Sequence, residues 1–138
     1  MDLTGITALV VDDHADTLEL VALVLEWAGA DVLVARSARD AERLLDDHGV
    51  DVIVCDEHLP HVDGCSFVRR VRQRVDEKRA VPVLGVSGDV EPRHIGAMLE
   101  AGFDDFLAKP LDTDVLVEAV GRVVDGPCRT AATGTSGP

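Results

Sequence analysis

Aromatic residues are scarce in this sequence: three Phe, one Trp and no Tyr occur in 138 residues, although 46% of the residues are hydrophobic. A chain of this length has the size of one ordinary domain and enough apolar residues for a core. That core must be built mostly from Val, Leu, Ile and Ala. An aliphatic core of this kind suits a buried parallel sheet that is covered by helices.

Positive charge is also scarce, and the formal net charge is −13. This excess of acid argues against a nucleic-acid binder, because phosphate backbones attract basic surfaces. Six of the thirteen basic residues nevertheless fall within residues 69–79. This basic stretch is either a solvated helix face and loop or a docking patch for an acidic partner. Its members are Arg69, Arg70, Arg72, Arg74, Lys78 and Arg79.

The cysteines are few and odd in number: Cys55, Cys65 and Cys128 form no CxxC pair. This pattern argues against a disulfide framework or a zinc site and fits a reducing compartment. The N-terminus lacks a basic region followed by an apolar run, and no apolar stretch approaches the roughly 18 residues that span a membrane. We therefore expect a soluble, cytoplasmic protein without a signal peptide or membrane contact.

Short apolar runs alternate with longer amphipathic stretches along the chain. Gly29 is expected to end the first of the amphipathic helices, and Ser37 with Asp40 is a predicted capping box at the start of the second. Asp112 is the predicted cap of the last helix. The apolar runs have strand length, and they are Ile6–Val11, Val32–Ala35, Val52–Cys55, Val81–Val86 and Phe103–Ala108.

The resulting order of elements is βα repeated five times, which predicts a parallel sheet with right-handed crossovers. It matches an α/β domain of the flavodoxin-like, doubly wound (βα)5 type, with strand order 2-1-3-4-5 and helices on both faces of the sheet. We assign residues 1–125 to this domain. Residues 126–138 are rich in Gly, Thr, Ser and Pro, and we expect a disordered tail or the start of a linker.

Polar side chains follow four of the predicted strands directly. Asp12 and Asp13 follow the first strand, Asp56 the third, Ser87 the fourth and Lys109 the fifth. In doubly wound folds, ligands bind outside the carboxyl ends of the strands. The sequence therefore predicts that three carboxylates, a hydroxyl and a lysine converge at this edge of the sheet.

Three neighbouring carboxylates repel one another unless a cation neutralises them. Their oxygen ligands favour Mg²⁺, with Mn²⁺ as the alternative ion. A carboxylate can attack phosphorus to give an acyl phosphate, while the metal and the Lys109 ammonium offset charge on the transferred group. Ser87 can donate a hydrogen bond to one of the phosphoryl oxygens.

In four stretches the sequence resembles the receiver domains of bacterial response regulators, including the chemotaxis type. The resemblance covers roughly residues 5 to 125, and each stretch closes a predicted strand. The stretches are Val10-Val11-Asp12-Asp13, then Asp56-Glu57-His58-Leu59-Pro60-His61-Val62-Asp63-Gly64, then Ser87-Gly88, and then Ala101-Gly102-Phe103-Asp104-Asp105-Phe106-Leu107-Ala108-Lys109-Pro110.

The resemblance implies a role for each site residue. Asp56 is the implied phosphoacceptor. The implied ligands of Mg²⁺ are the carboxylates of Asp13 and Asp56 and the backbone carbonyl of His58, with Asp12 acting through a metal-bound water. Lys109 is implied to pair with Asp56 before phosphorylation and with the phosphoryl group afterwards.

The resemblance also implies a conformational switch. Ser87 is the implied switch hydroxyl and Phe106 the switch aromatic, while the bond between Lys109 and Pro110 is cis in the family. Because Phe has no hydroxyl, a switch that needs a tyrosine hydrogen bond is unavailable here.

Other positions carry separate hypotheses. His58 and Asp89, which lie two residues after Asp56 and Ser87, are hypothesised to tune the lifetime of the acyl phosphate. The five histidines show no spacing typical of a metal cluster. Gly85 is expected to weaken the fourth strand and Gly96 the fourth helix, which together suggest a mobile region around these elements.

The expected function is Mg²⁺-dependent transfer of a phosphoryl group to Asp56 from a phosphohistidine of a sensor kinase or phosphotransfer protein. The chain is then no enzyme, apart from catalysing its own phosphorylation and dephosphorylation. It would signal through a protein partner or through an effector domain outside this sequence. The alternatives are a phosphorylation-independent binding module and a flavodoxin-like cofactor binder, although Asp12 and Asp13 would repel a cofactor phosphate in the absence of metal.

Overall fold

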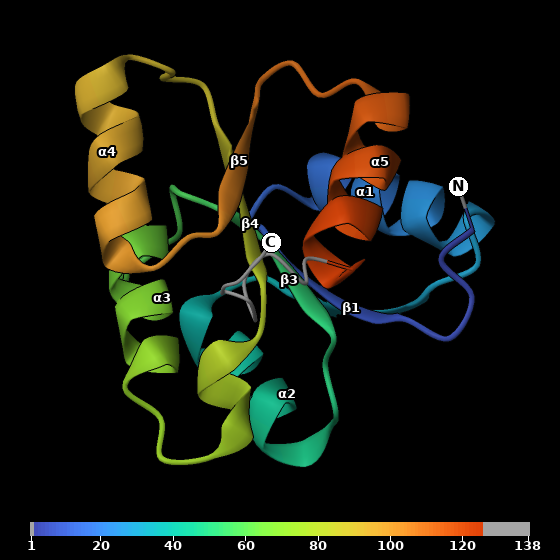
Figure 1. Ribbon diagram of the computed structural model, residues 1–138, viewed down its shortest axis with the longest axis horizontal. Coiled ribbons are helices and arrows are strands. Elements are labelled where there is room, and N and C mark those ends of the chain that lie inside the picture. The colour runs from blue at the N-terminus through green and yellow to red at the C-terminus, as the bar shows by residue number, and fades with distance from the viewer. Residues whose placement is uncertain (1, 126–138) are drawn as a thin grey trace, which may run out of the picture.

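The computed structural model describes residues 2–125, and the predicted tail and Cys128 lie outside this range. Strands and helices alternate around one sheet (Figure 1). The strands are β1 (Thr7–Val11), β2 (Asp31–Ala35), β3 (Val52–Asp56), β4 (Val83–Ser87) and β5 (Asp105–Ala108). The helices are α1 (Ala15–Trp27), α2 (Ala38–Asp47), α3 (Gly64–Arg72), the 3-10 helix η1 (Glu77–Ala80), α4 (Pro92–Ala101) and α5 (Thr113–Asp125).

The sheet has five strands in the order β2-β1-β3-β4-β5, and every neighbouring pair is parallel. This confirms the predicted fold class and strand order. Every residue of β3 and β4 is buried, as expected for central strands that are covered on both faces. The acid and the hydroxyl that end these two strands are thereby held in a rigid part of the molecule.

Two aliphatic cores cover the two faces of the sheet. One lies between the sheet and helices α1 and α5, and includes Leu25 and Leu116. The other lies between the sheet and helices α2, α3 and α4, and includes Leu45, Phe67 and Met98. Figure 1 shows α1 and α5 together at one side of the sheet and α3 and α4 at the other.

The predicted helix boundaries rest on identifiable caps. The Ser37 hydroxyl accepts a hydrogen bond from the backbone N–H of Asp40 at 3.2 Å, and Asp112 accepts from the N–H groups of the first turn of α5. Gly29 has φ +106° directly after the end of α1, a conformation that glycine adopts without strain. These contacts confirm the predicted caps at Ser37 and Asp112 and the predicted end of α1, while the Asp40 carboxylate lies 3.8 Å from Arg43 Nη1.

The fourth and fifth strands begin two residues later than the sequence suggested. Pro82 precedes β4 and has no N–H for a ladder, while Val81 still donates to Lys78 at the end of η1. Phe103 precedes β5 because its N–H bonds back to Met98 and helps to end α4. Both apolar side chains are nevertheless buried in the core that includes α3 and α4.

Gly85 does not weaken β4 in the way the sequence suggested. A methyl group at this position would lie 2.6 Å from Met98 Cε and 2.7 Å from Phe103 Cδ1. The absence of a side chain therefore lets the Phe103 ring and the end of Met98 pack directly against the strand. By contrast, nothing lies within 4 Å of a methyl group built at Gly88 or Gly96.

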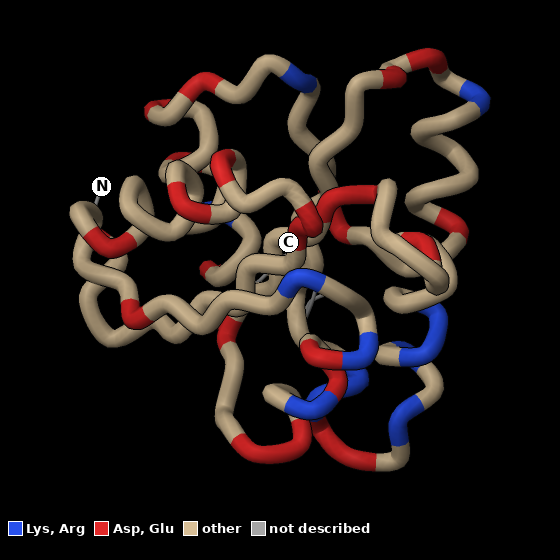
Figure 2. Tube along the Cα trace, turned by 180° about the vertical axis from the view of Figure 1, so that it is seen from behind, with Lys and Arg blue, Asp and Glu red and all other residues tan. Residues whose placement is uncertain are grey.

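The basic stretch of residues 69–79 is partly neutralised within the molecule. Arg70 pairs with Glu42 and Arg72 with Asp104, while Arg74 pairs with Asp46 and Asp76. In Figure 2 most of the blue positions lie in the lower half of the view, with red positions among them, and others lie at the top. This arrangement favours an internal electrostatic role for these three arginines.

Among the described residues, no helix is long and apolar enough to cross a membrane.

Candidate phosphoryl-transfer and metal site

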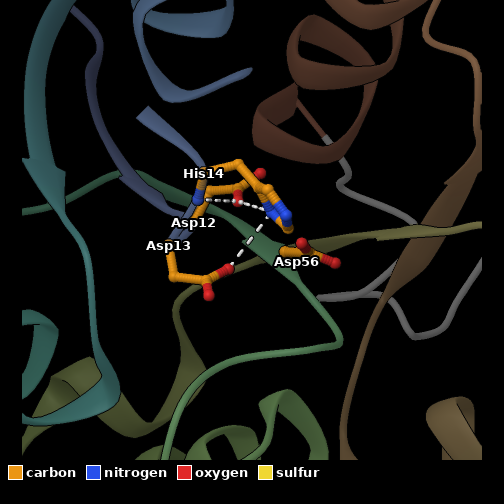
Figure 3. Close-up of side chains that lie close together, drawn as sticks. All are labelled: Asp12, Asp13, His14 and Asp56. Carbon is orange, nitrogen blue, oxygen red and sulfur yellow. Dashed lines mark hydrogen bonds and ion pairs between the residues drawn. The ribbon is translucent and has the colours of Figure 1, made fainter. Parts of the chain in front are cut away.

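Three carboxylates meet at the carboxyl edge of the sheet, as the sequence predicted. Asp12 and Asp13 follow β1 directly, and Asp56 is the last residue of β3, the strand that pairs with β1. Together with His14, each of these residues offers one ligand atom, and these atoms all lie within 4.8 Å of one another. Figure 3 shows the four side chains converging above the ends of the two strands.

The acids are buried to different degrees, and this affects their charge. Asp12 and Asp56 are only 5% and 2% exposed, whereas Asp13 is partly exposed. Burial raises the pKa of the Asp12 carboxyl and the nearby charge of Asp56 adds to the effect, while a hydrogen bond from the His14 backbone N–H opposes it. The charged form of Asp12 is therefore held at a cost that a bound cation would offset.

Lys109 supplies the positive charge that faces Asp56. Its Nζ lies 3.3 Å from each of the two Asp56 carboxylate oxygens. The backbone N–H of Lys109 donates to the carbonyl of Ser87 at 2.9 Å, and the bond between Lys109 and Pro110 is cis. The end of β5 thus places the Lys109 ammonium beside the Asp56 carboxylate, on the far side of β4.

His14 was missed as a member of this cluster, because its spacing from the other histidines gave no metal signal. Its Nδ1 lies 3.2 Å from Asp13 Oδ1 and 3.4 Å from Asp12 Oδ1. His14 occupies the N-cap position of α1 and makes no side-chain capping bond there. Its position directly after the two acids was the available signal.

Glu57 and His94 were also missed, and they surround the predicted switch hydroxyl. Ser87 is fully buried and its hydroxyl donates to Glu57 Oε1, while the other Glu57 oxygen bonds His94 Nε2 of α4. Glu57 directly follows Asp56, and successive side chains along extended backbone point to opposite sides. The position of Glu57 next to Asp56 in the sequence therefore gave no sign that its side chain contacts Ser87.

The remaining predicted residues lie around this centre. The His58 backbone N–H donates to Asp56 Oδ1 at 3.2 Å, while its side chain is 81% exposed and its Nε2 lies 3.6 Å from Glu57 Oε1. The Asp89 carboxylate accepts from the Glu91 N–H, and the Asp89 N–H donates to Ser87 Oγ. Phe106 is partly buried against the core that includes α3 and α4.

The donor set fits a hard divalent cation. Asp13 Oδ1 is buried and makes no hydrogen bond with any described residue, although His14 Nδ1 lies 3.2 Å away, and Asp13 belongs to the cluster of close ligand atoms. Oxygen donors of this kind suit Mg²⁺, which commonly binds through one or two carboxylates, waters and phosphate oxygens.

Comparison with known proteins places this site in a family. The family model described as the response regulator receiver domain matches residues 8–121. The transcriptional regulatory protein PrrA of Mycobacterium tuberculosis is 38% identical over 136 residues, which cover 96% of this chain and 56% of PrrA. The chain therefore spans just over half the length of this relative.

Two solved structures share both the fold and part of the sequence. The receiver domain of the Francisella response regulator 1452 has a TM-score of 0.81 at 28% identity, over 91% of this chain and 99% of that one. The receiver domain of the sensor histidine kinase PA1611 from Pseudomonas aeruginosa, solved with a magnesium ion in its active-site cleft, has a TM-score of 0.81 at 26% identity, over 89% and 100%.

The chain belongs to the response regulator receiver domain family of two-component signalling. This confirms the resemblance and the class of function read from the sequence. A phosphorylation-independent module would be expected to lack one of the acids or the lysine. All of them are present here, and they lie together.

Proposed function

We propose that Asp56 accepts a phosphoryl group from a phosphohistidine of a sensor kinase or a histidine phosphotransfer protein. The observation that carries this proposal is the buried Asp56 carboxylate, which has Asp12 and Asp13 on one side and both of its oxygens 3.3 Å from Lys109 Nζ. This carboxylate is held in place at the carboxyl edge of the sheet, and its lysine partner faces both of its oxygens.

The chemical step is a displacement at phosphorus. An Asp56 oxygen forms the new O–P bond, the P–N bond to the donor imidazole breaks, and the imidazole keeps the bonding electron pair. Lys109 stabilises negative charge on the transferred group, and Ser87 can donate a hydrogen bond to it. The chain thus acts on itself, and we propose no other substrate for it.

Mg²⁺, with Mn²⁺ as an alternative, is the proposed cofactor. Asp13, Asp56 and the backbone carbonyl of His58 would hold it, and Asp12 would act through a bound water. When bound, the ion neutralises the carboxylates and charge on the phosphoryl oxygens. The buried Oδ1 of Asp13, which makes no hydrogen bond among the described residues, supports this assignment.

We further propose that phosphorylation shifts an existing equilibrium in which Ser87 and Phe106 rearrange the surface around α4 and β5. His58 and Asp89 flank the site from the loops after β3 and β4, and we propose that they tune the lifetime of the acyl phosphate. The Asp89 N–H bond to Ser87 Oγ supports a link between that loop and the switch hydroxyl.

The proposed receiver domain comprises residues 1–125 and acts in the cytoplasm, where the described free thiols of Cys55 and Cys65 remain reduced. Its output is a protein partner or an effector domain beyond this sequence. The net charge of −13 supports a protein rather than a nucleic acid as the direct contact of this domain.

Intact-mass measurement after incubation with phosphoramidate and Mg²⁺ tests the proposal. We expect one phosphoryl adduct that requires Mg²⁺ and is absent from the Asp56→Asn variant. An adduct that persists in this variant would place the acceptor elsewhere. No adduct with phosphoramidate or with a phosphorylated kinase, in a folded and Mg²⁺-binding sample, would refute the proposed chemistry.

A further inference from the structure

Glu57 is a buried carboxylate that the phosphoryl-transfer chemistry does not use. Its side chain is only 5% exposed, and it contacts polar groups from two other parts of the fold. Oε1 accepts from the Ser87 hydroxyl at the end of β4, and Oε2 bonds Nε2 of His94 on α4. A third group, His58 Nε2, lies 3.6 Å from Oε1.

The Ser87 hydroxyl has one hydrogen to donate. Its oxygen lies 2.9 Å from the Asp89 carbonyl as well as next to Glu57, and the carboxylate is the stronger acceptor because the bond is charge-assisted. The hydrogen therefore points to Glu57. While it does so, it cannot be donated to an oxygen of a group attached to Asp56.

Helix α4 depends on few apolar contacts, which gives its polar contact to Glu57 more weight. Only Met98 and Ala101 of its ten residues are buried. His94 lies near the start of α4, and its side chain is 30% exposed. The partly exposed imidazole therefore connects the helix to the buried Glu57 carboxylate. Glu57 thus connects the switch hydroxyl to the position of α4 through two direct hydrogen bonds.

We infer that Glu57 is a positioning residue that holds Ser87 in its unphosphorylated orientation and links that orientation to α4 through His94. The inference rests on the proposed function, because it gives Ser87 a competing acceptor on Asp56. Phosphorylation then moves the Ser87 hydrogen from Glu57 to the phosphoryl group. Glu57 loses one of its two hydrogen bonds, and the anchor of α4 at His94 is weakened in the same event.

A double-mutant cycle measures the coupling between Glu57 and Ser87. Glu57→Gln keeps the shape of the side chain but replaces the charged acceptor by a weaker, neutral one. We expect it to increase the rate of phosphorylation by phosphoramidate about three- to tenfold, a change of the size that directly coupled residues show. In a Ser87→Ala background, where no hydroxyl remains to be released, the same substitution should leave the rate unchanged.

The link to α4 is measured without phosphorylation, by hydrogen exchange of residues 92–101. Glu57→Gln and His94→Ala should each increase exchange there, and the double variant should exchange no faster than the faster single variant. Asp114→Ala, a solvent-exposed change in another helix, is the matched control and should leave α4 unchanged. Circular dichroism checks that each variant is folded. If Glu57→Gln does not fold, His94→Ala removes the same hydrogen bond by changing its partly exposed partner.

The outcomes separate this inference from the proposed function. An equal rate increase from Glu57→Gln in the presence and absence of the Ser87 hydroxyl would overturn the positioning role. Additive effects of Glu57→Gln and His94→Ala on α4 exchange would overturn the link to the helix. If the wild-type chain takes no phosphoryl group, the proposed function fails, and so does the competition between Glu57 and the phosphoryl group for the Ser87 hydrogen. The link from Glu57 to α4 is then supported or overturned by the hydrogen-exchange result alone.

Discussion

The Lys109 ammonium nitrogen is equidistant from the two carboxylate oxygens of Asp56, at 3.3 Å from each. This position places one positive charge beside both oxygens of the carboxylate. We predict that Lys109→Ala slows phosphorylation by phosphoramidate about 100-fold, as the loss of one preorganised charge-stabilising group does elsewhere. Lys78→Ala removes the only other lysine and is the control, expected to react at the wild-type rate. A wild-type rate in Lys109→Ala would remove the lysine from the chemistry.

Binding of Mg²⁺ should stabilise the folded protein. The ion offsets repulsion among Asp12, Asp13 and Asp56, and at about 100 times its dissociation constant it adds roughly 2.7 kcal/mol to the free energy of unfolding. Urea denaturation with MgCl₂, compared with NaCl of equal ionic strength, measures this effect. Asp13→Asn should lose most of it, and an unchanged Mg²⁺ effect in this variant would place the ion elsewhere.

Without Mg²⁺, the buried Asp12 carboxylate should cost stability. Burial raises the pKa of Asp12, which means that its charged form is less stable in the folded protein than in water. We expect Asp12→Asn to increase the free energy of unfolding by about 1 kcal/mol, a typical size for one substitution, and to weaken Mg²⁺ binding. If the wild type were more stable than Asp12→Asn in metal-free buffer, the charged Asp12 carboxylate would not be costly in the folded protein, contrary to this prediction.

Asp63 should stabilise the start of α3 in a pH-dependent manner. Its Oδ1 accepts from the Ser66 N–H at 2.8 Å, and this bond holds the pKa of the Asp63 carboxyl below its usual value of 3.8. A lowered folded-state pKa gives a contribution that is present above pH 3.8 and is lost as the pH falls through the folded pKa. Asp63→Ala should cost about 1 kcal/mol at pH 7.

Asp63→Asn is the matched control for the capping charge. Asparagine caps about as well as aspartate, so this variant should be close to the wild type at pH 7, and its cap should not titrate. Its difference in unfolding free energy from the wild type should therefore shift in favour of Asn as the pH falls from 5 to about 2. A difference that is constant with pH, measured by urea denaturation, would rule out the ionised cap.

Two glycines should respond to the same substitution in opposite directions. Gly85→Ala places a methyl group against Met98 and Phe103 and should destabilise the protein by about 1–3 kcal/mol. Gly96→Ala meets no atom within 4 Å inside α4 and should stabilise it by roughly 1 kcal/mol. Thermal denaturation of the two variants checks both signs. Destabilisation by Gly96→Ala would contradict the prediction, because it would mean that the added methyl group has no free space at this position.

The sequence by itself determined the fold and the centre of the site. The apolar runs of strand length and the helices between them permitted a doubly wound sheet, and the sheet places the residue after each strand at one edge. Asp12, Asp13, Asp56 and Lys109 could be brought together in this way because their positions depend only on where strands end. The caps at Ser37 and Asp112 followed from local chemistry in the same manner.

Only the tertiary structure decided which side chains fill the space between elements. Gly85 was read as a weak point of its strand, but Phe103 and Met98 occupy the space that its missing side chain leaves. Glu57 and His94 are separated by 37 positions in the chain and meet because α4 follows β4, the strand that pairs with β3. Such contacts depend on how helices sit on the sheet and on which rotamers pack there, and neither local propensity nor hydrophobic periodicity encodes that arrangement.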